Sequence, residues 1–115
     1  MSYDVSLIDV NGNICSVPSH EEGGNYVLGG TSLSELNITY NYSSSFEAVL
    51  GKSGIKLLDR RLASDTIPSL VSAIVALGTG RDKDYWQPTD GNAGYALRIL
   101  LRWALQHPNA IWEVS

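Results

Sequence analysis

The chain has 115 residues, of which 43% are hydrophobic and 17% are charged; this is enough for one domain around one core and too little for a multidomain enzyme. Eight basic residues stand against twelve acidic ones, for a formal net charge of −4, so the chain has no overall positive field to hold a nucleic-acid backbone. The single cysteine excludes an internal disulfide and a zinc site built from several thiolates. With no signal-peptide or membrane-span pattern, we expect a soluble cytosolic protein.

Short alternating segments dominate the first part of the chain and predict strands. Residues 3–8 alternate and lead to Asn11-Gly12, a strong hairpin signal. Residues 14–17 are the expected return strand, which Pro18 should end because proline cannot donate to a sheet ladder. Two further strands are predicted at residues 25–28 and 36–42.

Helical patterns dominate the second half. Ser44 and Glu47 have capping-box spacing, which predicts a short helix over residues 45–50 ending at Gly51. Thr66 as cap, with Pro68 in the first turn, predicts a helix over 67–77. Thr89 or Asp90 can cap a third helix over 91–106, and 110–114 should form a last strand. The expected fold is a single α+β domain over residues 1–115, with an antiparallel sheet of about four strands, two main helices and one short helix.

Both main helices are apolar around most of their circumference. On 91–106 the polar arc narrows to Arg98, Arg102 and Gln106, and on 67–77 only Ser69 and Ser72 interrupt the apolar residues. A chain of this length has difficulty covering two such helices, which predicts a homo-oligomer. An alternative of equal weight is a monomer in which the sheet covers one side of each helix and the two helices cover each other on a second side.

Catalytic and metal constellations are weak. Asp9, Asn11 and Asn13 have the spacing of calcium-loop ligands, but the glycine and final glutamate of that loop are missing. Cys15 and His20 could pair as thiolate and imidazole, yet Cys15 falls in a predicted strand, where a cysteine is usually a buried hydrophobe. We therefore expect no enzymatic activity, no metal and no cofactor.

A set of polar residues is instead suited to an anion or nucleotide. A glycine turn and a helix start offer backbone amides, arginine forks match phosphate oxygens, and aromatic rings such as Tyr40, Tyr85 and Trp86 can stack on a base. Alternation along 36–42 should put three polar side chains on one sheet face. The predicted ligand-binding residues are Gly30, Thr31, Asn37, Thr39, Asn41, Arg60, Asn92, Arg98 and Arg102.

Several stretches give the chain a family resemblance. The segments YDVSLID, GGNYVLGGT, LNITYNYSSSF, DYW and TDGNAGYAL resemble small uncharacterised proteins encoded by bacteriophages and prophages. The resemblance covers most of the chain and carries no enzymatic motif. It implies a phage accessory protein in the host bacterial cytosol, a kind of protein that often counters host defence.

Three functions remain open at this stage. The first is sequestration of a small anionic nucleotide-like ligand in the predicted site. The second is inhibition of a host defence protein, such as a CRISPR nuclease complex, with exposed aromatics such as Trp86 and Trp112 as anchors. The third is hydrolysis of a nucleotide signal by His20 with Glu21 or Glu22. Beyond such a partner and further copies of itself, the chain is expected to bind neither a membrane nor nucleic acid in general.

Overall fold

A three-stranded antiparallel sheet joins the two ends of the chain. The computed structural model describes residues 1–20 and 31–115, without the side chains of 19 and 20. Strand β1 (Ser2–Ile8) lies between β4 (Glu35–Thr39) and β5 (Ile111–Val114). Because side chains alternate along a strand, Val5 and Leu7 are buried while Asp4 faces outward and is exposed. The last strand is thus confirmed and closes the sheet against the first.

The predicted Asn-Gly turn follows β1. The Asp9 carboxylate accepts hydrogen bonds from the backbone N–H groups of Asn11 (2.9 Å) and Asn13 (3.0 Å), and Gly12 has a φ of +83°. That positive φ is the reason for a glycine here. The turn prediction is confirmed.

The segment after the turn does not return along β1 as a strand. It makes one isolated bridge to β1, and β2 (Ser16–His20) pairs with β3 (Thr31–Leu33) in a separate two-stranded sheet. Pro18 lies inside β2, so the prediction that it ends the strand is wrong. The β2–β3 register is irregular between its two paired positions, so an interior residue without an N–H is tolerated. The strand predicted at 25–28 lies outside the described residues.

Strand β4 is shorter than its alternation predicts. It ends at Thr39, and Tyr40–Tyr42 form a 3-10 turn, η1, instead of continuing the strand. The cause is local, because the Thr39 hydroxyl accepts a hydrogen bond from the backbone N–H of Asn41 at 3.2 Å and so caps the turn. The face shared by three polar side chains therefore does not form.

Helix α1 (Ser43–Leu50) begins two residues before the predicted start and ends at Gly51, as predicted. Its N-cap is Tyr42 and no side chain caps it, so the capping-box interpretation of Ser44 is wrong. The 3-10 helix η2 (Gly54–Leu58) follows, a segment without a clear sequence signal. The φ of +97° at Gly51 explains the glycine that ends α1.

Helix α2 (Ala63–Leu77) begins one turn before the prediction, with Leu62 as N-cap. Thr66 is consequently a buried helical residue and not a cap. Its hydroxyl donates to the carbonyl of Ala63 (2.7 Å) and accepts from the indole N–H of Trp112 (2.8 Å). The helix ends before Gly78, as predicted. Thr66 thus ties α2 to β5 inside the core.

Helix α3 (Asp90–Gln106) has Thr89 as N-cap, as predicted, and the Thr89 hydroxyl accepts from the N–H of Asn92 at 3.1 Å. Two glycines let α3 lie against the end of α2. A Cβ added at Gly94 would meet the carbonyl oxygen of Gly78 at 1.7 Å, and one added at Gly91 would meet that of Gly80 at 1.9 Å. Only residues without a side chain fit at these two positions.

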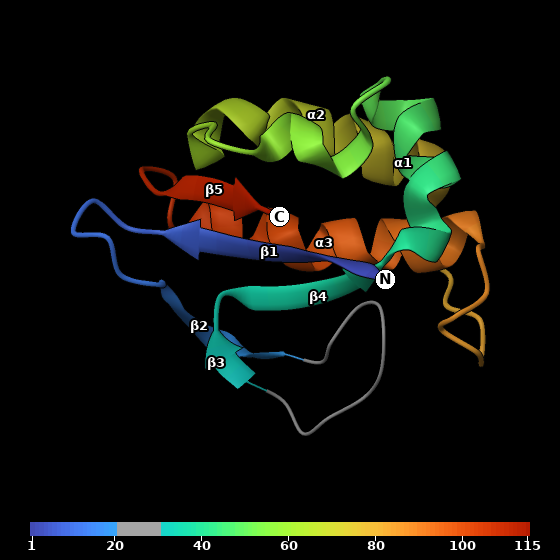
Figure 1. The fold of residues 1–115 in the computed structure, drawn as a ribbon, viewed down its shortest axis with the longest axis horizontal. Coiled ribbons are helices and arrows are strands. Elements are labelled where there is room, and N and C mark those ends of the chain that lie inside the picture. The colour runs from blue at the N-terminus through green and yellow to red at the C-terminus, as the bar shows by residue number, and fades with distance from the viewer. Residues whose placement is uncertain (21–30) are drawn as a thin grey trace.

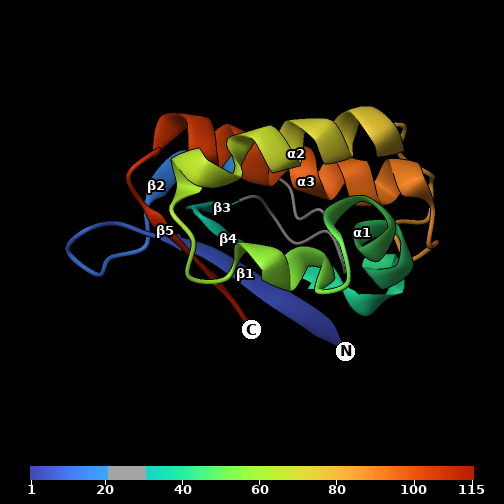
Figure 2. The same ribbon diagram turned by 90° about the horizontal axis from the view of Figure 1, so that it is seen from above.

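Helix α3 packs against one face of the three-stranded sheet, and α2 packs on α3 and also contacts β5 at the edge of the sheet (Figures 1 and 2). The core includes Trp103 of α3 against Trp112 of β5, with ring centroids 6.5 Å apart. The chain is a single α+β domain, as predicted. Because the sheet and α2 cover α3 from two sides, its apolar circumference needs no second subunit. Among the described residues, no helix combines the length and apolarity needed to cross a bilayer.

Candidate functional site

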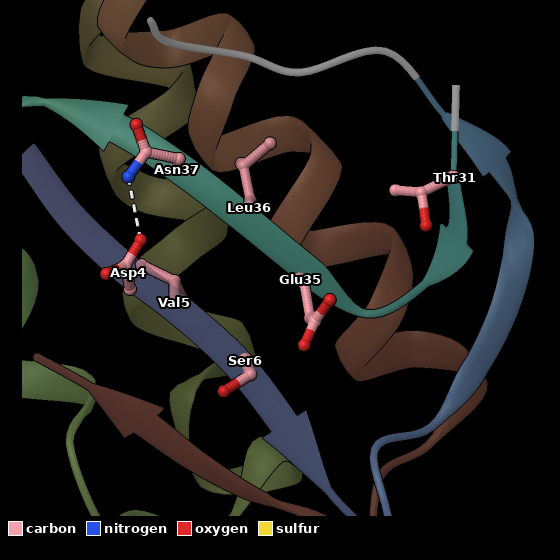
Figure 3. Close-up of a pocket in the computed structure, with 7 residues that line it drawn as sticks. All are labelled: Asp4, Val5, Ser6, Thr31, Glu35, Leu36 and Asn37. Atoms are coloured by element: carbon pink, nitrogen blue, oxygen red, sulfur yellow. Dashed lines mark hydrogen bonds between the residues drawn. The ribbon is translucent and has the colours of Figure 1, made fainter. Parts of the chain in front are cut away.

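The predicted ligand residues Thr31 and Asn37 come together, but in acidic surroundings. They line a hollow of about 360 Å³ on the outer face of the sheet, together with Asp4 and Glu35 (Figure 3). The Asn37 amide donates to the Asp4 carboxylate at 2.7 Å and to the Ser2 hydroxyl at 2.8 Å. With its donors used and two carboxylates beside it, this hollow does not suit an anion.

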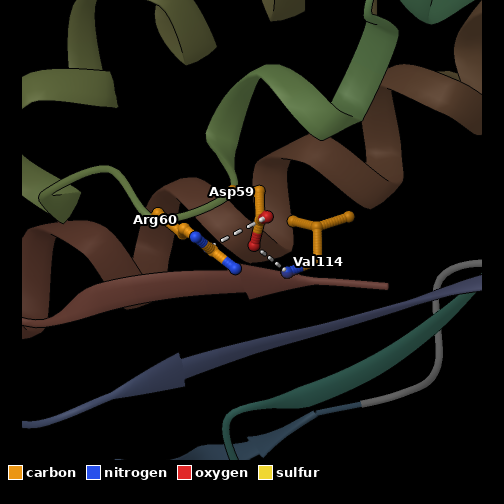
Figure 4. Close-up of polar contacts among 3 residues, drawn as sticks. All are labelled: Asp59, Arg60 and Val114. Atoms are coloured by element: carbon orange, nitrogen blue, oxygen red, sulfur yellow. Dashed lines mark hydrogen bonds and ion pairs between the residues drawn. The ribbon is translucent and has the colours of Figure 1, made fainter.

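Arg60 lies at the other edge of the same sheet. It approaches Asp59 at 3.9 Å, and the Asp59 carboxylate also accepts from the N–H of Val114 at 2.9 Å (Figure 4). The hollow of about 460 Å³ beside Arg60 is lined by Asp4, Asp59 and Glu113 among others. Arg60 thus belongs to an acidic surface and is separate from the arginines of α3.

Three predicted residues have structural roles that keep them from a ligand. Thr39 is buried and caps η1, as described above. The Asn41 side chain leaves the sheet face and donates to the carbonyl of Trp86 at 2.8 Å. Asn92 is 3% exposed. Gly30 lies outside the described residues. The predicted set is therefore not assembled as one site by the residues that the structure describes.

Asn92 instead organises the loop that joins α2 to α3. Its side-chain oxygen accepts from the N–H of Asp82 at 2.9 Å, while its amide donates to the carbonyls of Asp84 (3.2 Å) and Gln87 (3.0 Å). One buried amide from the first turn of α3 thus holds three points of the loop backbone. A polar group this deeply buried is retained because its partners are all in place.

The same loop is held by bonds within it, and the start of α3 that follows it is held by α1. The Asp84 carboxylate accepts from the N–H of Trp86 at 3.0 Å, and Asp82 accepts from the N–H of Asp84 at 2.9 Å. The Ser45 hydroxyl of α1 donates to the Asp90 carboxylate at 2.8 Å. These bonds add to the Asn92 contacts that hold the loop between α2 and α3.

Tyr42 fastens the loop to η1, because its hydroxyl donates to the carbonyl of Tyr85. Burial raises the pKa of Tyr42 to about 12, with the positive charge of Arg81 acting in the opposite direction. The phenol consequently keeps its proton, and therefore its role as donor, at physiological pH.

Aromatic side chains lie on both of the segments that the Asn41 side chain joins, η1 and the loop. Trp86 is 45% exposed, and its ring centroid lies 5.3 Å from that of Tyr85. Tyr40 is also exposed and packs against Tyr3 with centroids 4.5 Å apart, while the neighbouring Asn41 holds the Trp86 carbonyl. We call Tyr40, Tyr85 and Trp86 the Trp86 patch. It is an exposed aromatic surface on an ordered backbone.

Arginines flank the beginning of the same loop. The guanidinium groups of Arg81 and Arg98 lie 4.5 Å and 4.8 Å from the ring centroid of Tyr95. Arg102 follows one helical turn after Arg98 and is exposed. The guanidinium groups of Arg81 and Arg98 are both attracted to the face of the Tyr95 ring. This attraction holds the two arginines close to each other at the surface.

The aromatic residues of this site are predictable from the sequence, but the residues that hold them in place are not. Trp112, expected as a second exposed anchor, is fully buried in β5 against Trp103, so that expectation is wrong. Tyr42 and Arg81 were missed. Their signal is only the closeness of the DYW segment to a helix start, without any indication of which residues would hold it. Within residues 1–18 and 31–115, no three His, Cys, Asp or Glu side chains gather as metal ligands do.

The surroundings of Cys15, the candidate nucleophile, do not activate its thiol. Cys15 is buried, and burial, with a smaller effect of the Asp9 carboxylate, raises the pKa of its thiol. The thiol form, which is the poor nucleophile, is therefore favoured. The side chain of His20, and Glu21 and Glu22 altogether, lie outside the described part of the chain.

Comparison of the chain with family models, with curated proteins and with solved structures finds no match.

Proposed function

We propose that this chain is a non-enzymatic phage accessory protein that binds a host defence protein through the Trp86 patch and so inhibits it in the bacterial cytosol. The observation that carries the proposal is a half-exposed tryptophan on a loop fastened by the buried Asn92 and Tyr42. Tryptophan, tyrosine and arginine are the residues most enriched where protein interfaces gain their affinity.

The hydrogen bonds that hold the loop support a role for it in binding a partner protein. Neither Trp86 nor Tyr40 adds a fully buried side chain to the core, so the bonds to Asn92, Asp84 and Asn41 order an exposed surface. A surface ordered in advance loses less conformational entropy when a partner binds. The patch therefore has both the side chains and the rigidity that a recognition surface needs.

The test is affinity purification of the tagged chain from phage-infected cells, followed by quantification of co-purified proteins. We expect one host protein in stoichiometric amount with the wild type. Trp86→Ala should weaken that complex about 30-fold, the equivalent of a 2 kcal/mol hot spot. Leu105→Ala is the matched control, because Leu105 is an apolar side chain 60% exposed on α3. Equal capture by wild type and Trp86→Ala, or no stoichiometric partner, would contradict the proposal.

A second candidate, sequestration of a small anionic nucleotide-like ligand, is favoured by the pair of arginines on Tyr95. Guanidinium groups match phosphate oxygens, and Arg81, Arg98 and Arg102 belong to this surface. Mass spectrometry of small molecules released by heat from the purified protein tests it. A nucleotide released from wild type and from Arg61→Ala but not from Arg98→Ala supports this candidate, whereas equal release from Arg98→Ala excludes this surface as the site.

A further inference from the structure

The outer face of α2 is the one helix surface in the described structure that combines exposed apolar side chains with a long uncharged sequence. Figures 1 and 2 show α2 with α3 beneath it and with α1 and η2 along one flank. Val75 is 79% exposed and Val71 is 43% exposed. From Thr66 to Gly80 the sequence has no charged residue. Exposed apolar surface without any charge is typical of an interface and not of a solvated helix.

A groove lies beside these valines on the same face. It has a volume of about 300 Å³ and is lined by Pro68, Ser69 and Ser72 of α2 and by Val49, Leu50 and Leu57 from the flanking elements. Its walls are apolar or small and carry no charge. The surface therefore presents a protruding side chain, Val75, and a groove that could receive an apolar side chain of that size.

The spacing of these two features is self-complementary. Val75 lies two helical turns after Pro68, with Val71 and Ser72 midway between them. If a second α2 crosses this one antiparallel about a twofold axis between residues 71 and 72, Val75 of each copy meets Pro68 and the groove of the other. A twofold axis brings the same patch of both copies together, which is the usual geometry of homodimers.

We propose that the outer face of α2 binds a second copy of this chain, with Val75 of each copy seated in the groove beside Pro68 of the other. Charge supports this occupant, because two uncharged faces meet without burying an ionised group, whereas the chain as a whole carries a net charge of −4. The proposal also locates the oligomer expected from the sequence: the sheet and α2 cover most of α3, whereas α2 exposes Val71 and Val75 next to a groove. It does not depend on the Trp86 patch.

The size of the face limits the affinity. A helix of 15 residues is about 22 Å long, and one helix pair with the flanking groove buries less than the roughly 800 Å² per partner of a standard stable interface. We therefore expect a dimer with a dissociation constant in the micromolar range or weaker, which is visible as concentration-dependent mass.

Sedimentation velocity of the intact chain from about 5 μM to about 1 mM, a range that spans such constants, tests the proposal. We expect a shift from the 12.5 kDa monomer to the dimer. Val75→Lys should raise the dissociation constant about 100-fold, because symmetry places the lysine twice in the interface and each copy accounts for about tenfold. Leu105→Lys, on an exposed site of α3, should leave it unchanged. Circular dichroism of both variants checks that they are folded.

A cross-linking experiment tests the geometry itself. Val71→Cys should give a cross-linked dimer with a short bismaleimide, since residue 71 lies next to the proposed axis, whereas Leu105→Cys should not. The wild type, whose only cysteine is the buried Cys15, gives the background. A monomer throughout the concentration range, a dimer insensitive to Val75→Lys, or equal cross-linking from positions 71 and 105 would each overturn the proposal.

Discussion

Replacement of Asn92 by alanine should remove the hydrogen bonds that hold the loop between α2 and α3, while the rest of the fold stays in place. The substitution removes three hydrogen bonds, one from the N–H of Asp82 and two to the carbonyls of Asp84 and Gln87. Each such bond contributes about 0.5–1.5 kcal/mol, so the set amounts to about 1.5–4.5 kcal/mol. Asp82, Asp84 and Gln87 are exposed, so water replaces part of the loss, and we expect about 2 kcal/mol.

Two measurements follow this change. Urea unfolding should show the loss in free energy, and the midpoint of thermal unfolding should fall by about 8 °C for a domain of this size. Hydrogen exchange of the Asp82 amide should accelerate, because its acceptor is gone. Asn109→Ala is the control, since Asn109 is an exposed asparagine. A loss below about 0.5 kcal/mol, or unchanged exchange at Asp82, would refute the view that Asn92 organises the loop.

Two other predictions concern the core and pH. Gly94→Ala should cost about 3 kcal/mol in urea unfolding, because its Cβ would meet the Gly78 carbonyl oxygen at 1.7 Å, whereas Gly80→Ala meets nothing within 4 Å; equal effects of the two would contradict the close packing. The native pKa of Tyr42, about 12, lies above its ordinary value of 10.0, so the folded state holds this proton more tightly than the unfolded state. The resulting stability is fully present below pH 10 and is lost as pH rises toward 12. The Tyr42→Phe variant should not show that loss of stability. If wild type and variant have parallel profiles of unfolding free energy against pH, Tyr42 does not contribute to the pH dependence.

The start of α3 and the C-terminal ends of α1 and α2 could be predicted because their signals are local. Thr89 caps α3, and Gly51 and Gly78 follow the last residues of α1 and α2, each for a reason that lies within one turn of the chain. The start of α2 could not be predicted in this way. Thr66 is a good capping residue by type, but its hydroxyl serves Trp112 instead, a partner far along the sequence.

In the candidate site, too, contacts between residues distant in the sequence could not be predicted. Trp86 and Trp112 were both expected to be exposed. Trp86 is exposed, whereas Trp112 is buried because β5 pairs with the central strand. The role of Asn92 was beyond prediction for another reason. Its partners are backbone groups of the loop, and backbone groups have no sequence signature. Asn41 was selected as a ligand residue for the polar amide that in fact holds the Trp86 carbonyl.

The pairing of β1 with β5 has a consequence for folding during synthesis on the ribosome. Val5 faces Val114 across the sheet, so the middle strand lacks one neighbour until the segment about 110 residues further along has been translated. At about 5–20 residues per second, that wait is roughly 5 to 20 seconds. During this interval β1 offers an unpaired edge with apolar side chains, which is the kind of segment that chaperones shield and that nascent chains aggregate through. The central strand thus gains its second neighbour only after α3 has been made, although that neighbour lies beside the first residues of the chain.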